Sequence, residues 1–128
     1  MGVITRSFEP ENDLTIFAVS GSVDAEQLTT QIISFLKGEP TQLVLWDITE
    51  GSLAAIPAKD LRMIVDLASP FAHRRKGGRT AIVCTTDLNF GLSRMFQSFA
   101  ELMHIPFEMH VFRVFEEAKG WLYELRKG

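Results

Sequence analysis

Three histidines, one cysteine and sixteen acidic residues are the side chains of this 128-residue sequence that could perform acid–base chemistry or hold a metal. His73, His104 and His110 show no metal-ligand spacing with cysteine or carboxylate residues. The run Gly91-Leu92-Ser93-Arg94-Met95 is similar to half of a nucleophile elbow, but it lies inside a helical pattern and lacks the second glycine. Glycines stand singly at the strand–helix junctions, so no phosphate-binding loop is predicted. We therefore expect no catalytic residue, no metal and no cofactor, and a binding module instead of an enzyme.

The first candidate site is the polar segment Asp47-Ile48-Thr49-Glu50-Gly51-Ser52, predicted as a loop after a short apolar strand. In open α/β sheets, ligands gather at the carboxyl ends of strands, where loops and helix N-termini offer unpaired N–H donors. Asp47, Thr49, Glu50 and Ser52 supply the polar groups of a partner or ligand loop. The alternative is that Asp47 caps the turn and the hydroxyls bond locally.

The second candidate site is one face of the helix predicted over 87–103. Phe90 points away from the apolar stripe of this helix, alongside Arg94, Gln97 and Glu101. Aromatic and arginine side chains are favoured anchors in protein contacts, so Phe90, Arg94 and Gln97 form a candidate contact face. Alternatively, Phe90 tucks beneath the preceding loop. The stripe assigned to the core is Leu88, Leu92, Met95, Phe96, Phe99 and Met103.

Two further features have a structural and a functional explanation. The basic run from His73 to Arg79 follows a predicted helix end, where positive charge complements the helix dipole. The same run could meet an anionic lipid headgroup or a phosphate. Cys84 ends the apolar run that starts at Ala81, which favours a buried, inert thiol over a reactive one.

The elements that position these residues alternate between strand and helix. We expect the first two strands to form a hairpin, the segment 43–47 to be a central strand, and the last strand to lie near a sheet edge. Asp24 and Gln27 have the spacing of a capping box. The predicted strands are 3–8, 14–19, 43–47, 80–85 and 107–112, and the predicted helices are 24–37, 57–69, 87–103 and 114–125.

Length and composition favour one domain over residues 1–128. The hydrophobic fraction of 46% supports a real core, and a single cysteine excludes an intramolecular disulfide. The net charge of −3 argues against nucleic-acid binding. Neither a signal-peptide pattern nor an apolar run near the ~20 residues that span a bilayer is present. We expect a cytoplasmic protein without stable membrane insertion.

Segments spread over nearly the whole chain form a joint pattern: Leu43–Asp47, Gly78–Val83, Asp87–Met95, Val111–Arg113, Glu116–Ala118 and Trp121-Leu122. Together they resemble the bacterial SpoIIAA-like family of small stand-alone STAS/SEC14-type proteins. The resemblance implies an α/β fold of the SpoIIAA-like (STAS) kind, ordered β-β-α-β-α-β-α-β-α, with a mixed sheet whose later strands are parallel.

The resemblance also implies two functions. Anti-sigma factor antagonists bind a partner kinase and are switched off by phosphorylation of a serine after the central strand. SEC14/CRAL-TRIO domains hold an apolar ligand. The antagonist pattern places Asp-Ser and then Gly at the start of the second helix, and residues 47–57 do not reproduce it. We expect a non-catalytic regulatory module with a protein partner, such as a kinase-type anti-sigma factor, or a homodimer. The alternative is a small-molecule or lipid binder.

Overall fold

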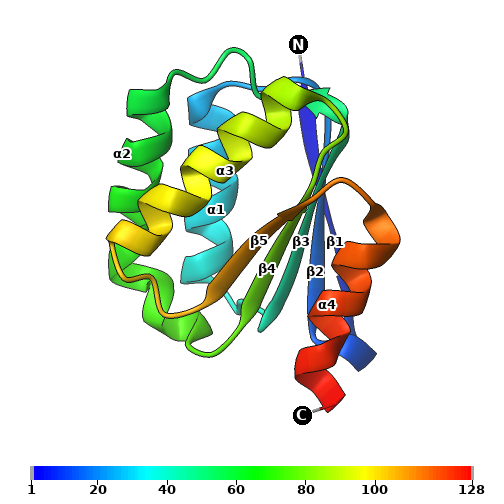
Figure 1. Cartoon of the computed structure of the whole chain (residues 1–128). Helices are drawn as coiled ribbons and strands as arrows, with labels where there is room; N and C mark the ends of the chain where they lie inside the picture. Colours follow the sequence, from blue (N-terminus) through cyan, green and yellow to red (C-terminus); the bar gives the residue numbers. More distant parts are fainter. Residues whose placement is uncertain (1, 128) are drawn as a thin grey trace.

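The structure, a computed structural model, describes residues 2–127 and side chains as far as Leu125. One five-stranded sheet carries helices on both faces (Figure 1). The strands are β1 (Val3–Glu9), β2 (Leu14–Ser22), β3 (Leu43–Ser52), β4 (Arg79–Val83) and β5 (Glu108–Phe112). The helices are α1 (Ala25–Lys37), α2 (Ala58–Ala68), α3 (Asp87–Leu102) and α4 (Phe115–Lys127), with short 3₁₀ helices η1 (Pro10–Asn12) and η2 (Ser69–Arg75).

The sheet is mixed, and its order follows the chain, β1-β2-β3-β4-β5. β1 and β2 pair antiparallel through the η1 turn, where Asp13 adopts a left-handed conformation with φ of 50°. The other neighbours pair parallel, so α1, α2 and α3 serve as crossovers on one face, while α4 covers the opposite face (Figure 1). The predicted fold class, hairpin, central strand and edge position of β5 are confirmed.

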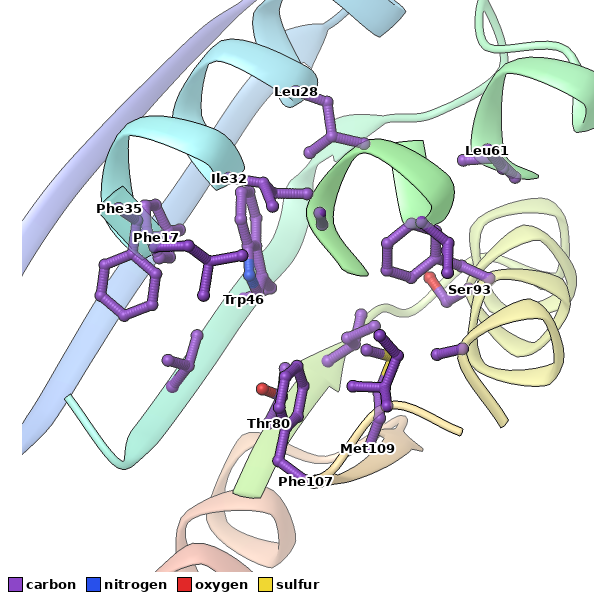
Figure 2. Close-up of a pocket in the computed structure, with 18 of the residues that line it drawn as sticks. Phe17, Leu28, Ile32, Phe35, Trp46, Leu61, Thr80, Ser93, Phe107 and Met109 are labelled. Carbon is purple, nitrogen blue, oxygen red and sulfur yellow. The ribbon is translucent and has the colours of Figure 1, made fainter. Parts of the chain in front are cut away.

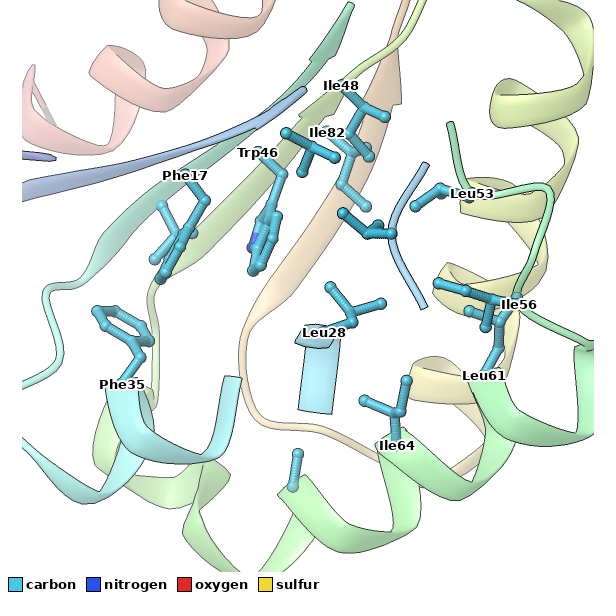
Figure 3. Packing of buried hydrophobic residues seen from close by; sticks show 14 of the residues in the cluster. Phe17, Leu28, Phe35, Trp46, Ile48, Leu53, Ile56, Leu61, Ile64 and Ile82 are labelled. Atoms are coloured by element: carbon cyan, nitrogen blue, oxygen red, sulfur yellow. The ribbon is translucent and has the colours of Figure 1, made fainter. Parts of the chain in front are cut away.

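Side-chain alternation along β3 divides the interior into two clusters of buried residues. Val44 and Trp46 point toward α1–α3 into the first cluster, whereas Leu43 and Leu45 point toward α4 into the second. At one end of the first cluster, the ring of Phe17 stacks on Trp46, with centroids 4.2 Å apart (Figure 3). β3 is therefore covered on both faces, as its continuous apolar run predicted.

The prediction of a loop over 47–52 is wrong, because β3 continues to Ser52. Its pairing with β2 shifts at one point, where Ile48 and Thr49 face the single residue between Ala18 and Ser20. This is a β-bulge, after which pairing resumes as far as Ser22. A Cβ atom at Gly51 would lie 2.6 Å from Val19 Cγ1, so glycine permits the close approach of the strands here.

The predicted core face of α3 is only partly right. Leu92, Phe96 and Phe99 pack against the first cluster, but three other residues assigned to the core are exposed on the helix surface: Leu88, Met95 and Met103. The buried positions are instead Asn89, Ser93 and Ala100. Small and polar side chains let α3 approach the sheet closely, and Asn89 bonds to Gly51 at the end of β3 and to Leu53 just after it. Tertiary contacts of this kind, more than the hydrophobic periodicity, determine which face of α3 is buried.

Candidate functional site

Asp47 and its neighbours are bonded to one another at the carboxyl end of β3. The carboxylate of Asp47 accepts hydrogen bonds from Thr49 N at 3.0 Å and from Thr49 Oγ1 at 2.7 Å. The bulge interrupts the ladder at Ile48 and Thr49, and Asp47 supplies an acceptor for the Thr49 amide. Ser52 Oγ similarly accepts from Ala54 N at 3.1 Å, while Glu50 is exposed. The geometry matches the local-bonding alternative, and a contact role for this segment stays a prediction.

The start of α2 lacks a residue that could carry a phosphate. Pro57 is the N-cap and makes no side-chain cap bond, and Ile56 and Ala58 flank it. Thr49 and Ser52 lie within β3, with their hydroxyls in the local bonds described above. A phosphoserine at this helix start therefore has no counterpart in the chain.

Asn89 joins the two candidate regions, which sequence reasoning treated separately. Its side chain is buried, accepts from Leu53 N at 3.0 Å and donates to Gly51 O at 2.9 Å. The first turn of α3 is thus held against the end of β3. The only signal for this residue in the sequence was its position next to Phe90.

Phe90 lies between the core and an arginine. Its ring is half-buried and packs against the first cluster, and the Arg113 guanidinium carbon is 4.3 Å from the ring centroid. Arg113 also pairs with Asp87 at 2.9 Å. Arg94 is exposed and Gln97 half-buried, so the three candidate residues do not share one environment.

Truncation of Phe90 to alanine is expected to lower the melting temperature. The ring is packed, so its loss costs about 1–3 kcal/mol, less than the 3–5 kcal/mol typical of a fully buried Phe. Leu88→Ala is the matched control, because Leu88 lies two residues earlier in the same helix and is 56% exposed. Thermal denaturation measures both variants, and an unchanged Phe90→Ala protein would instead favour a contact role.

A cavity of about 90 Å³ lies between the sheet and α1, α2 and α3 (Figure 2). All but three of its lining residues are apolar, and the exceptions are Arg75, Thr80 and Ser93. Its walls come from β2, β3, β4 and β5, from the three helices, from η2 and from the segment that leads into β5. The apolar lining includes Phe17, Leu28, Ile32, Phe35, Trp46, Ile48, Leu61, Ile82, Leu92, Phe96, Phe107 and Met109.

Arg75 brings a positive charge to one end of this cavity. It is 2% exposed, and it donates to Thr41 O, Gln42 O and Arg79 O at 2.9–3.0 Å and to Thr80 Oγ1 at 2.7 Å. Burial lowers the pKa of the guanidinium to about 9, and the Asp13 carboxylate opposes the shift.

Arg75 stands in the last turn of η2, as the helix-end explanation of the basic run expects, but its side chain is buried, which neither explanation predicted. The chain continues beyond Pro70 as η2, which turns this side chain inward, whereas Arg74 stays exposed and donates to Leu36 O at 2.7 Å. Arg79 also serves the fold, with a bond to Trp121 O at 2.7 Å. Adjacent arginines look alike in sequence, so nothing there distinguished the buried one.

Ser93 and Cys84 meet at the other side of the first cluster. The Ser93 hydroxyl is buried and has no hydrogen-bond partner among the described residues. Burial raises the pKa of the neighbouring Cys84 thiol, and the Ser93 hydroxyl and the Arg113 charge oppose the rise. The prediction that Cys84 is buried is confirmed.

Cys84 is expected to resist thiol reagents at pH 7 and to react once the protein unfolds, because the thiolate is the reactive form. The raised pKa also predicts a pH effect. The contribution of the buried Cys84 thiol to stability is complete below the unfolded-state pKa of about 8.5, and it is lost as the pH rises through the folded-state pKa. Labelling with a chromogenic disulfide in native and denaturing buffer measures the first effect, with Cys84→Ala as the blank; rapid native labelling would contradict it.

Between residues 2 and 127 no helix is long and apolar enough to cross a membrane. In the same part of the chain, no three His, Cys, Asp or Glu side chains gather closely enough to hold a metal ion.

Comparison with known proteins identifies solved structures that share this fold. No protein-family model matches the sequence, and no curated protein is similar enough to indicate a relative. Among solved structures, the chain is similar to an uncharacterised DUF3478-family protein with a SpoIIAA-like fold from Shewanella loihica PV-4. That match has a TM-score of 0.55 and 26% identity, and it covers 94% of this chain and 93% of the other.

A second solved structure is an anti-sigma factor antagonist from Mycobacterium paratuberculosis. The TM-score is 0.60 at 12% identity, over 95% of this chain and 94% of that one. The chain therefore has a SpoIIAA-like fold, as its sequence resemblance implied. At 12% identity the likeness to the antagonist concerns the fold alone.

Proposed function

We propose that this protein is a non-catalytic binding module whose ligand is a small, mainly apolar molecule held in the cavity between the sheet and α1–α3. The observation that carries the proposal is the cavity itself, because native interiors rarely keep such space unfilled. A near-continuous apolar lining with a few polar groups is typical of small-molecule sites. This lining favours the second of the two functions that the family resemblance implied.

The cavity volume limits the ligand to a few carbon atoms. An engineered cavity of about 150 Å³ in another protein accepts benzene, and the space here is smaller, at about 90 Å³. Each buried CH₂ group contributes about 0.8 kcal/mol, so a chain of four carbons gains about 3 kcal/mol. Millimolar affinity is the scale to expect for such a ligand. A long acyl chain would need the helices to separate.

Neutral alcohols from ethanol to 1-hexanol test this proposal. We expect affinity to rise with chain length to about four carbons and then to fall, as measured by amide chemical shifts of residues around the cavity. Ser93→Leu is the matched variant, because the longer side chain fills the space and should abolish binding. Linear, non-saturating shifts, or equal binding by both proteins, would refute a ligand cavity.

A protein partner is the second candidate function, and exposed apolar residues on α3 favour it. Leu88, Met95 and Leu102 recur every seven residues, and their side chains are 56%, 37% and 71% exposed. An exposed stripe of this kind suits a contact with another chain, whether an anti-sigma factor or a second copy. An anti-sigma factor antagonist has the same fold.

Substitution of Met95 by aspartate tests the stripe on α3. If the stripe binds a partner, the Met95→Asp variant should no longer retain the proteins that the wild type binds in a lysate of its native cell. Met63→Asp is the control, since Met63 is similarly exposed on α2, outside the stripe. The same proteins retained by both variants would exclude this surface.

A further inference from the structure

We propose that the ligand of the cavity is a short-chain carboxylic acid, whose carboxylate pairs with Arg75 and Thr80 and whose apolar chain fills the remaining space. This inference rests on the proposed ligand-binding function and adds the chemical class of the ligand. It starts from the charged end of an otherwise apolar cavity.

The charge of Arg75 has no contacting counterion. The salt bridges between described side chains involve Arg79 and Arg113 and leave Arg75 without a carboxylate partner. Its acceptors are three backbone carbonyls and one hydroxyl, which solvate the charge without neutralising it. The Asp13 carboxylate acts on this charge without forming an ion pair with it. A buried charge with no ion-pair partner is costly, so an anion in contact with the guanidinium would recover part of this cost.

One N–H group of Arg75 remains available for such an anion. The guanidinium has five N–H donors, and the bonds to Thr41, Gln42, Arg79 and Thr80 use four of them. The fifth belongs to Nη1, the same nitrogen that donates to Thr80 Oγ1. Arg75 is one of the residues that line the cavity.

The hydroxyl of Thr80 supplies a second donor at the same place. Thr80 is 4% exposed and lines the cavity (Figure 2). Its oxygen accepts from Arg75 Nη1 at 2.7 Å, so its own hydrogen is left to donate, and the structure gives it no acceptor among the described residues. Two adjacent donors, one of them charged, match the two oxygens of a carboxylate.

The single positive charge in the cavity lining favours a ligand with one negative charge. Arg75 is the one charged residue in the lining that the structure describes, so a phosphate dianion would enter with one negative charge unmatched. The bonds of Arg74 to Leu36 O and of Arg79 to Trp121 O engage the neighbouring cations elsewhere.

The remaining space fits a short chain. At about 30 Å³ per group, the share of a water molecule in the liquid, the cavity holds about three methyl or methylene groups. The carboxylate occupies part of the same 90 Å³, so the propyl chain of butanoate is the upper limit for the apolar part of the ligand. Ser93 also lines this space and reaches into it from α3 (Figure 2).

Butanoate, 1-butanol and butylamine share a chain length and differ in the head group, so they test this inference. Calorimetric titration at pH 7 should show that butanoate binds the wild type at least tenfold more tightly than 1-butanol, with no binding of butylamine. Equal or weaker binding of butanoate would overturn the inference and leave the apolar cavity standing. No binding of any of the three would overturn the proposed function as well.

Two substitutions at Thr80 locate the head group without removing Arg75. Thr80→Val keeps the shape and loses the hydroxyl, so the affinity for butanoate should fall about tenfold while that for 1-butanol is unchanged. Thr80→Ser keeps the hydroxyl and should retain butanoate binding. Thermal melts verify that each variant is folded; butanoate binding that is equal in folded Thr80→Val and wild type would place the carboxylate elsewhere and refute the inference.

Discussion

Replacement of Arg75 by alanine is expected to lower the free energy of unfolding by about 3 kcal/mol. The substitution removes the Arg75 donors of the Thr41 and Arg79 carbonyls, and each buried unsatisfied group costs about 1–3 kcal/mol. The Gln42 carbonyl loses one of its two donors and keeps the Arg79 amide at 3.0 Å. It also removes the contact with the Phe107 ring, whose centroid is 4.3 Å from the guanidinium carbon. Removal of a buried charge offsets part of the loss. In a domain of this size the melting temperature should fall by about 10 °C.

Arg74→Ala is the control for that measurement. Arg74 is adjacent, exposed and bonded through a single contact to Leu36 O, so its loss should cost less than about 1 kcal/mol. Denaturant unfolding of both variants compares them at one temperature. Equal losses of unfolding free energy in the two variants would show that the stabilising effect of Arg75 does not come from its burial or from its bonds to backbone carbonyls.

Truncation of Phe17 to alanine is expected to cost about 4 kcal/mol, the largest effect of a single apolar substitution proposed for this protein. The ring is fully buried, stacks on Trp46 at 4.2 Å and meets Phe35 edge-on at 5.3 Å (Figure 3). Phe17 also lines the cavity, so its removal should enlarge that space. Saturating benzene should therefore restore part of the lost melting temperature.

Phe8→Ala is the matched control for Phe17. Phe8 is 58% exposed on β1, so its truncation should change stability by about 0.5 kcal/mol or less, and benzene should leave this variant unaffected. Calorimetric melts with and without benzene measure both effects. A Phe17→Ala protein as stable as Phe8→Ala would contradict the packing of the first cluster.

Local chemistry made the element order predictable. The capping box of α1 is present, with Gln27 N donating to Asp24 Oδ1 at 2.8 Å and Gln27 Oε1 accepting from Asp24 N at 3.1 Å. Thr86 caps α3 through a bond of the same spacing, accepting from Asn89 N at 3.2 Å. These bonds join residues three apart, so the sequence alone contains all the information that they require.

The candidate site depended on contacts between distant segments, which explains why less of it was predicted. Polar residues after position 47 looked like a loop, but β2 offers them a partner strand, and Gly51 allows the close pairing instead of breaking it. Arg75 is bonded to residues more than thirty positions away, at Thr41 and Gln42. No local pattern reports such a bond, so the charged end of the cavity was visible only in the folded chain.

The single helix on the second face of the sheet has a consequence for biosynthesis. Leu43, Leu45 and Val83 are buried by α4, which contributes Ala118 and Leu122 to the second cluster. All five strands precede α4 in the chain, so a nascent polypeptide carries this apolar face uncovered until residues 115–127 have left the ribosome. Chaperone binding to the emerging chain should therefore persist until α4 is outside the ribosome and should fall once this helix has packed on the sheet.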